Sequence, residues 1–376
     1  MKILHTIYDD PANPWLGGGG AFRTFEICKR LADRHEVTIL CGRYPGARHE
    51  ERIDGVRILR VGSSQSYAIS RLAYTASASR YVAQASPDLW VYSFSAFTPL
   101  LASEALRGDA ILECFHLMQE HATEKHAILG HVAAAAEIAT LNAYNQIISI
   151  SPSVSDEIAK LRNNDDGLHL VYTGVDAACF IEDPTEEDYI LYFGRLDTYT
   201  KGLDLLFEAY ARISDEPNCP PLVVAGRGTP KRVEEIDGLI RTHRLTDRVT
   251  LTGPVSSEAK TDLFRRSLFN VAPSRYEGWC IAAIEASAAS KAIVGARIPG
   301  LMDAVQEGKT GLLVESENVS ELATAMQEMI TNHDLRQKLG RQGREWADQF
   351  TWDKIAAAQE RVYINILNAR PTMENA

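Results

Sequence analysis

The chain of 376 residues predicts an α/β protein with two doubly wound, parallel-sheet domains. Short runs rich in β-branched and aromatic residues alternate with helical patterns along the chain, which is typical of parallel sheets flanked by helices. The alternation forms two series, separated by the polar, acidic segment 181–188. The length supports the same conclusion, because it is long for one typical domain and sufficient for two, each with its own core.

The first series covers residues 1–180 and predicts an N-terminal Rossmann-like domain. Its first residues, MKILHT, read as the start of a strand. The further expected strands are 37–40, 56–61, 89–93, 110–115 and 146–150. The expected helices between them are 21–34, 68–84, 97–107, 120–143 and 152–161. Five arginines between Arg43 and Arg60 are interrupted by acidic residues, which favours a solvated face over a patch for membranes or anionic acceptors.

The second series covers residues 181–350 and predicts a second Rossmann-like domain. The expected strands are 189–194, 221–226, 249–253, 268–273, 291–296 and 311–315. The expected helices are 201–214, 230–242, 257–266, 279–289 and 319–330. After about residue 333 only helical patterns follow, so we assign residues 351–376 to a separate C-terminal helix.

The composition is that of a globular protein and argues against a nucleic-acid partner and a membrane span. Hydrophobic residues make up 45% of the chain and charged residues 24%, as in an ordinary globular protein. The net charge of −11 argues against nucleic acid as a partner, because phosphate contacts need a basic face. The six cysteines form no C-x-x-C pair, and no stretch reaches the ~18 apolar residues that a membrane span needs. We expect a cytoplasmic protein, with peripheral contact on the inner face of a membrane left open.

Residues 273–300 are the most informative segment for function. Glu277 and Glu285 lie eight positions apart, the first in a loop after an apolar strand and the second in a helix expected from about Trp279. The start of such a helix offers free N–H groups and a positive dipole end, which suit an anion. The carboxylates can accept hydrogen bonds from hydroxyl groups, so the segment fits a nucleotide sugar. On spacing alone, an ordinary helix with two solvated acids is the alternative.

The Glu277–Glu285 pattern after Pro-Ser resembles the E-x7-E motif of retaining glycosyltransferases with the GT-B fold, most closely those of family 4. The resemblance runs nearly from end to end, because further motifs follow in the family's order. They are Gly17–Gly20, Phe115-His116, Ser149–Ser151, Tyr172–Asp176, Phe193–Leu196, Lys201–Leu203, Val224–Gly228, Asp247–Val249 and Gly308–Val314. The resemblance implies a GT-B fold, two Rossmann-like domains facing across a cleft, with the last helix returning to the N-terminal domain.

The resemblance also assigns roles on the donor side. Arg195 and Lys201 match positions that contact the donor's pyrophosphate, where positive charge stabilises the leaving group. Glu285 is implied to accept hydrogen bonds from the ribose, and Glu277 to lie near the hydroxyls of the transferred sugar.

The loop between the two glutamates is implied to bind the donor phosphates. It contains Gly278, and the amides of Trp279, Cys280 and Ile281 are expected to meet the phosphates. Cys280 departs from the family pattern, which has glycine at this position, so donor geometry or sugar choice can differ. Pro299 likewise stands where the family has a first glycine, and Thr173 where it has an asparagine.

In the N-terminal domain, Gly18 and Gly19 are expected to approach the donor, and His116 to lie beside the reaction centre. The glycine run does not fit a dinucleotide-binding loop. The G-x-G-x-x-G motif of such loops would need a glycine at position 23, where this chain has Arg23. No metal site is expected: the chain has no D-x-D triplet, and His121 and His126 have poor spacing for a metal pair.

The function implied is transfer of a hexose-type sugar from a nucleotide diphosphate donor, with retention, to a hydroxyl of a glycan, lipid-linked or small-molecule acceptor. No cofactor is expected, and the oligomeric state is unknown. In such enzymes the acceptor hydroxyl attacks the face from which the phosphate leaves, so Arg195, Lys201, Glu277 and His116 are the catalytic candidates. Two alternatives stay open: another GT-B activity, such as an epimerase or a phosphorylase, and a non-catalytic nucleotide-sugar-binding subunit.

Overall fold

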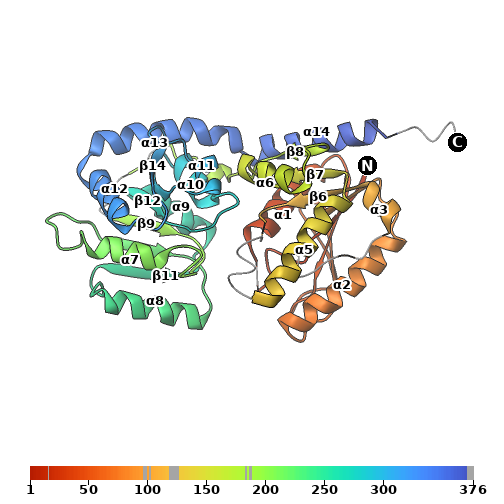
Figure 1. The fold of residues 1–376 in the computed structure, drawn as a ribbon, viewed down its shortest axis with the longest axis horizontal. Helices are drawn as coiled ribbons and strands as arrows, with labels where there is room; N and C mark the ends of the chain where they lie inside the picture. Colours follow the sequence, from red (N-terminus) through yellow and green to blue (C-terminus); the bar gives the residue numbers. More distant parts are fainter. Residues whose placement is uncertain are drawn as a thin grey trace. The chain divides into compact units, whose positions relative to one another are not determined.

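The structure, a computed structural model, describes residues 1–15, 17–95, 100, 103–117, 127–182, 184–185 and 189–370 (Figure 1). It divides into two compact units, Met1–Thr173 with the C-terminal segment from Trp352, and Gly174–Thr351. Each unit is an α/β sheet with helices around it, and the combination of the two is the GT-B architecture that the sequence predicts. No described helix is long and apolar enough to cross a membrane.

The first unit is built on a sheet with the strand order β3-β4-β2-β1-β5-β6-β7-β8. The strands are β1 (Lys2–Thr6), β2 (Glu36–Gly42), β3 (Glu50–Ile53), β4 (Val56–Val61), β5 (Leu89–Ser93), β6 (Ala110–Cys114), β7 (Gln146–Ser149) and β8 (Leu168–Leu170). The helices are α1 (Gly19–Leu31), α2 (Tyr67–Gln84), α3 (Glu104–Gly108), α5 (Ala127–Ala143), α6 (Pro152–Arg162) and α14 (Trp352–Asn368). Its core contains Leu4, Leu40, Trp90 and Leu112, from four of the parallel strands.

The second unit carries an all-parallel sheet in the order β11-β10-β9-β12-β13-β14. The strands are β9 (Ile190–Phe193), β10 (Leu222–Ala225), β11 (Val249–Gly253), β12 (Phe269–Ala272), β13 (Ala292–Ala296) and β14 (Gly311–Val314). The helices are η1 (Ala177–Cys179), α7 (Leu203–Ala211), α8 (Pro230–Thr242), α9 (Ser257–Arg266), α10 (Ile281–Ala288), α11 (Pro299–Ala304), α12 (Val319–Thr331), α13 (His333–Ala347) and η2 (Asp348–Phe350). A separate core fills this unit and includes Leu206, Phe207, Phe269 and Met326.

The first unit ends at Thr173, whereas the sequence predicts a boundary after residue 180. Val175 is already part of the second unit, because its N–H donates to the Phe350 carbonyl at 2.7 Å and it forms a bridge with Thr351. The expected linker 181–188 lies inside the second unit, and its residues 183 and 186–188 fall outside the described residues.

The arginine-rich stretch is mostly solvated, as the sequence predicts, but Arg60 is buried. β3 pairs antiparallel with β4, and this edge strand is absent from the expected series. Arg60 is 1% exposed, with its Nε 2.8 Å from Asp10 Oδ2, and it also pairs with Glu51 of β3. Across the two strands Glu50 pairs with Arg57 and Glu51 with Arg60, while Arg48 and Arg52 remain exposed.

The C-terminal helix α14 packs on α1 of the first unit, as the resemblance implies. Its Gln359 reaches the buried ion pair between Arg23 of α1 and Glu113 of β6: Arg23 Nη2 donates to Gln359 Oε1 at 2.9 Å, and Gln359 Nε2 donates to Glu113 Oε1 at 3.0 Å. The side chain of His5 lies beside this cluster, and burial lowers its pKa to about 4, so it is neutral at pH 7. A neutral amide thus completes the cluster without adding a third buried charge.

Helix α13 approaches α10 closely because two glycines of α13, Gly340 and Gly343, face α10. A Cβ on Gly340 would lie 2.0 Å from the carbonyl oxygen of Ser290, which follows α10, and one on Gly343 would lie 3.3 Å from the Ser287 hydroxyl. This contact holds α10, which carries Glu285, against the rest of its unit.

Gly340→Ala should destabilise the protein by about 1–3 kcal/mol, because the added methyl must displace backbone. Gly238→Ala is the matched control, since Gly238 lies within helix α8 and a Cβ there would meet nothing within 4 Å. It should raise the free energy of unfolding by up to about 1 kcal/mol through helix propensity alone. Urea unfolding measures both variants, and equal stability of the two would contradict the close α10–α13 contact.

Candidate functional site

The candidate site of the second unit lies where the strand order of its sheet reverses. β9 is the first strand of this sheet along the chain, and β12 is its neighbour on the other side from β10. In open α/β sheets ligands bind outside the carboxyl ends of the strands at such a point. The loop after β9 carries Arg195 and Lys201, and the loop after β12 carries Glu277.

Lys201 and Glu277 form a direct ion pair. Lys201 Nζ lies 2.6 Å from Glu277 Oε1, and the Ser274 hydroxyl donates to the same oxygen at 2.8 Å. The two charged side chains are only 19% and 11% exposed. The sequence predicts separate roles for them, on phosphate and on sugar. In the structure the two side chains hold each other, while the lysine keeps N–H groups for a further acceptor.

Glycine backbone brings these two loops together. Gly202 has φ +66°, and a Cβ there would lie 2.0 Å from the Pro273 carbonyl oxygen. Gly300 of α11 lies similarly close to the loop after β12, because a Cβ there would come within 2.2 Å of the Glu277 carbonyl oxygen. Only glycine fits either position. The missing first glycine at Pro299 therefore leaves the close approach to Glu277 intact.

Glu285 has a lysine partner as well. Lys260 Nζ of α9 lies 2.6 Å from Glu285 Oε1, and the two side chains are 17% and 8% exposed. Burial opposes the charge on Lys260, but Glu285 outweighs it, so the pKa of Lys260 is raised. Lys260 belongs to none of the sequence motifs, and nothing in its local pattern identifies it. Glu277 and Glu285 are thus each neutralised by a lysine from another element.

Helix α10 begins at Ile281, two residues later than the sequence predicts, so Glu285 lies just over one turn into the helix. Trp279 and Cys280 belong to the preceding loop, with Cys280 as the N-cap and no side chain capping the helix. The amides of Ile281 and Ala282 have no acceptor within the described part of the chain. They are the free donors at this helix start. Gly278 precedes them in the loop.

Trp279 and Cys280 are buried rather than open to a ligand. Their exposed fractions are 5% and 4%, and the Trp279 ring packs edge-on against Phe350 at 5.1 Å. Burial raises the pKa of the Cys280 thiol to about 12, so the thiol is neutral at pH 7. Cys280 therefore acts as a small packing side chain at a position where the family has glycine.

Arg195 is exposed and makes no hydrogen bond or ion pair through its side chain among the described residues. The turn behind it is held by Asp197, which accepts from the Thr200 N–H at 3.0 Å and pairs with Arg232 at 2.9 Å. Burial opposes ionisation of Asp197, but these partners outweigh it and lower its pKa. Asp197 is a structural residue of the site that the motifs do not reveal.

In the first unit, an aspartate shapes the glycine loop. Asp9, which follows β1, accepts from the Gly17 amide at 2.8 Å and from the Gly18 amide at 2.7 Å. Gly18 and Gly19 are expected to approach the donor, but the amide of Gly18, like that of Gly17, already has a partner. Gly19 and Gly20 are the first residues of α1, and a Cβ on Gly20 would lie 2.7 Å from the Phe115 ring. Close packing therefore also requires glycine here.

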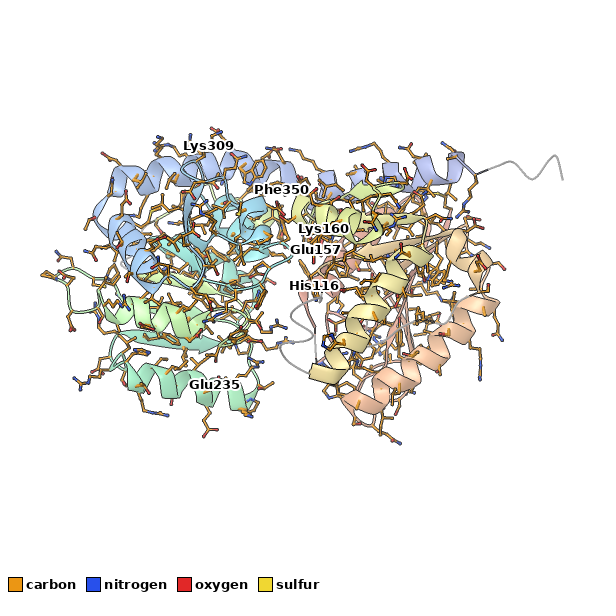
Figure 2. All side chains as sticks on the ribbon, in the orientation of Figure 1. His116, Glu157, Lys160, Glu235, Lys309 and Phe350 are labelled. Carbon is orange, nitrogen blue, oxygen red and sulfur yellow. The ribbon has the colours of Figure 1, made fainter. Side chains whose placement is uncertain are left out.

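His116 is exposed just after the carboxyl end of β6, where the sequence places it (Figure 2). It belongs to the first unit, as do Gly18 and Gly19, whereas Arg195, Lys201, Glu277 and Glu285 belong to the second. His121 and His126 lie outside the described residues.

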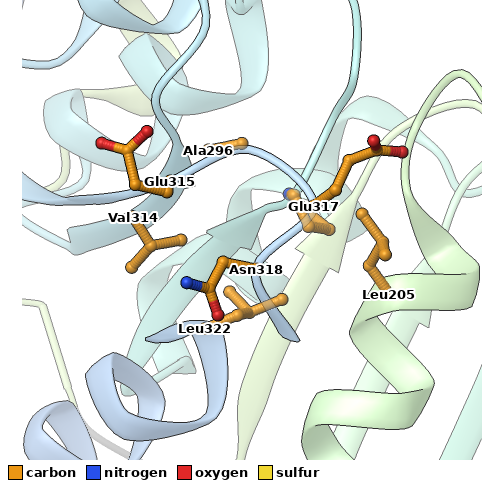
Figure 3. A pocket seen from close by; sticks show the side chains of 8 residues that line it. Leu205, Ala296, Val314, Glu315, Glu317, Asn318 and Leu322 are labelled. Carbon is orange, nitrogen blue, oxygen red and sulfur yellow. The ribbon is translucent and has the colours of Figure 1, made fainter. Parts of the chain in front are cut away.

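A small cavity lies behind the β12 loop (Figure 3). It is lined by Leu205, Pro273, Val314, Glu317 and Asn318, and its volume of about 10 Å³ has room for about one water molecule. The cavity is too small for a sugar or a nucleotide, so it belongs to the packing behind the site.

Models of known protein families match both units of the chain. The model of the family described as Glycosyl transferases group 1 matches residues 180–346, and the model described as Glycosyltransferase Family 4 matches residues 17–178. A D-inositol 3-phosphate glycosyltransferase of Jonesia denitrificans is 31% identical over 52% of this chain and 51% of its own length. The chain spans between 51% and 60% of the curated relatives that it matches first.

Solved structures share the fold. The sucrose-phosphate synthase of Thermosynechococcus elongatus superimposes with a TM-score of 0.83 at 22% identity, covering 98% of this chain and 99% of that one. The Anabaena protein HepE, determined in complex with UDP and glucose, superimposes with a TM-score of 0.73 at 16% identity, covering 98% and 100% of the two chains. Two family models that together match nearly the whole chain, over a GT-B fold, show that this protein belongs to the group 1 glycosyltransferases.

Proposed function

We propose that the protein transfers a hexose-type sugar from a nucleotide diphosphate donor to an acceptor hydroxyl, with retention of configuration and without a metal ion. The acceptor is a glycan, a lipid-linked sugar or a small molecule. The observation that carries the proposal is the Lys201–Glu277 pair beside the free N-terminus of α10, at the point where the strand order reverses. This arrangement offers positive charge, free amides and a carboxylate within one group of loops.

The donor's parts match the chemistry of these groups. Arg195, Lys201 and the amides that begin α10 suit the diphosphate, because they supply charge-assisted hydrogen bonds. Glu285 has one oxygen on Lys260, and its other oxygen is assigned to the ribose hydroxyls. Glu277 is assigned in the same way to the hydroxyls of the transferred sugar. The structural relative HepE, solved with UDP and glucose, supports a donor of this class.

In the proposed reaction the bond between the sugar carbon and the phosphate oxygen breaks, and the acceptor oxygen bonds to the same carbon from the same face. The acceptor's proton passes to the departing phosphate oxygen. Arg195 and Lys201 stabilise the negative charge that grows on the leaving group, which is the electrostatic form of catalysis. The proposal assigns His116 to the reaction centre and gives Gly18 and Gly19 a place beside the donor.

The proposed reaction takes place in the cytoplasm. All six cysteines are buried and free, which supports a reducing compartment.

Lys201→Ala and Arg195→Ala should each lower turnover by about two orders of magnitude or more, because each removes charge that stabilises the leaving group. Arg241→Ala is the control, since the side chain of Arg241 in α8 is 62% exposed and pairs with Asp237 at the surface. Release of nucleotide from a panel of UDP-, GDP- and ADP-sugars measures the three variants. Turnover of the Lys201 and Arg195 variants close to that of the control would refute the assignment.

Activity should survive exhaustive treatment with EDTA, because Arg195 and Lys201 supply the charge that a divalent ion would otherwise provide. Transfer rates before and after chelation, and after return of Mg²⁺ or Mn²⁺, test this. Loss of transfer on chelation, with recovery on adding a metal, would show that the reaction needs a cation.

A further inference from the structure

Arg275 makes the densest set of polar contacts near the candidate site. It lies in the β12 loop between Ser274 and Glu277, and its side chain is 9% exposed. Nη1 and Nη2 donate to the two carboxylate oxygens of Asp204, both at 2.8 Å, and Nε donates to Glu317 Oε1 at 2.6 Å. A two-pronged contact of this kind fixes direction as well as distance.

Arg275 attaches its loop to the turn that carries Lys201. Its backbone N–H donates to the Thr200 carbonyl at 3.1 Å, and its Nη1 also donates to the Tyr199 carbonyl at 2.9 Å. The guanidinium carbon lies 4.6 Å from the centre of the Tyr199 ring, a cation–π contact. Tyr199, Thr200 and Asp204 lie on both sides of Lys201, so the arginine binds this turn before and after the lysine.

Glu317 connects a third segment, the loop after β14. Its backbone φ is +63°, in the left-handed region that is unfavourable for a residue with a Cβ. Figure 3 shows Glu317 and Asn318 on this loop beside Leu205 of α7, around the small cavity. Such local strain persists only where surrounding contacts determine the conformation, and the contact with Arg275 is one of them.

These contacts raise the pKa of Arg275, chiefly through the hydrogen bonds that it donates to Asp204, so the guanidinium stays charged. Arg275 therefore joins three loops through one rigid, permanently charged group. Two of these loops contribute the partners of the Lys201–Glu277 ion pair.

We propose that Arg275 is a positioning residue that holds Lys201 against Glu277 before a nucleotide binds. Arg275 reaches the donor only through these two side chains, so its effect on binding is indirect. The functional meaning of this role rests on the proposed donor site, whereas the structural role can be tested without any ligand. Preorganised charge binds a diphosphate without first ordering the loops.

The first test is hydrogen exchange in the ligand-free protein. Arg275→Met should increase exchange by about tenfold or more in segments 198–202 and 274–279, because both lose their shared anchor. Arg212→Met is the matched control: Arg212 is 44% exposed and joins α7 to α12 through Glu208 and Ser320, away from the site. Unchanged exchange in the two segments, or the same increase in the control, would overturn the proposal. If Arg275→Met does not fold, Asp204→Asn serves in its place, with the same expectation.

The second test separates positioning from general stability. We would measure affinity for UDP, GDP and ADP by calorimetry in Arg275→Met, Lys201→Met and the double variant. Alone, Arg275→Met should weaken the affinity for the best-bound nucleotide by about tenfold. In the Lys201→Met background, the same change should weaken this affinity by less than about twofold. Equal losses in both backgrounds would overturn the proposal. If the wild type binds none of the three nucleotides, the proposed function fails, and the exchange experiment still decides the role of Arg275.

Discussion

The ion pair between Lys201 and Glu277 depends on the close approach of two loops that follow neighbouring strands. Gly202 allows this approach, because it meets the Pro273 carbonyl with no room for a side chain, and Gly300 of α11 meets the Glu277 carbonyl of the β12 loop in the same way. Partly buried charges are stable only when they are paired. The Lys201–Glu277 pair therefore stabilises the two loops whose close approach forms the pair. The arrangement of these two loops in the second unit follows from this mutual dependence.

In the first unit, other charged side chains hold the loops in place. Asp9 fixes the glycine loop through two backbone amides, and Arg23 pairs with Glu113 directly before the strand end that leads to His116. Gln359 of α14 completes that pair, so a helix from the end of the chain supports residues near its beginning. In both units, buried or partly buried charged side chains determine where the loops lie.

Much of the fold could be predicted from the sequence, because strand and helix patterns are local. The two α/β units and most of their elements follow from those patterns, and the E-x7-E segment directs attention to the loop after β12 and to α10. The side-chain partners could not be predicted, since they are distant in the chain: 76 residues separate Lys201 from Glu277, and 25 separate Lys260 from Glu285. The edge strand β3 was missed because its sequence, EERI, is too polar to resemble a strand. The start of α10 was placed too early because Trp279 and Cys280 are apolar but belong to the loop.

The most direct test of the account is calorimetric titration of the wild type and Glu285→Ala with UDP, GDP and ADP. The account predicts that the wild type binds at least one of these nucleotides. It also predicts that Glu285→Ala weakens this binding by about tenfold or more, as expected for a lost hydrogen bond to a charged group. Equal affinity of the two proteins, or no binding by either, would contradict the placement of the donor at the carboxyl ends of β9 and β12.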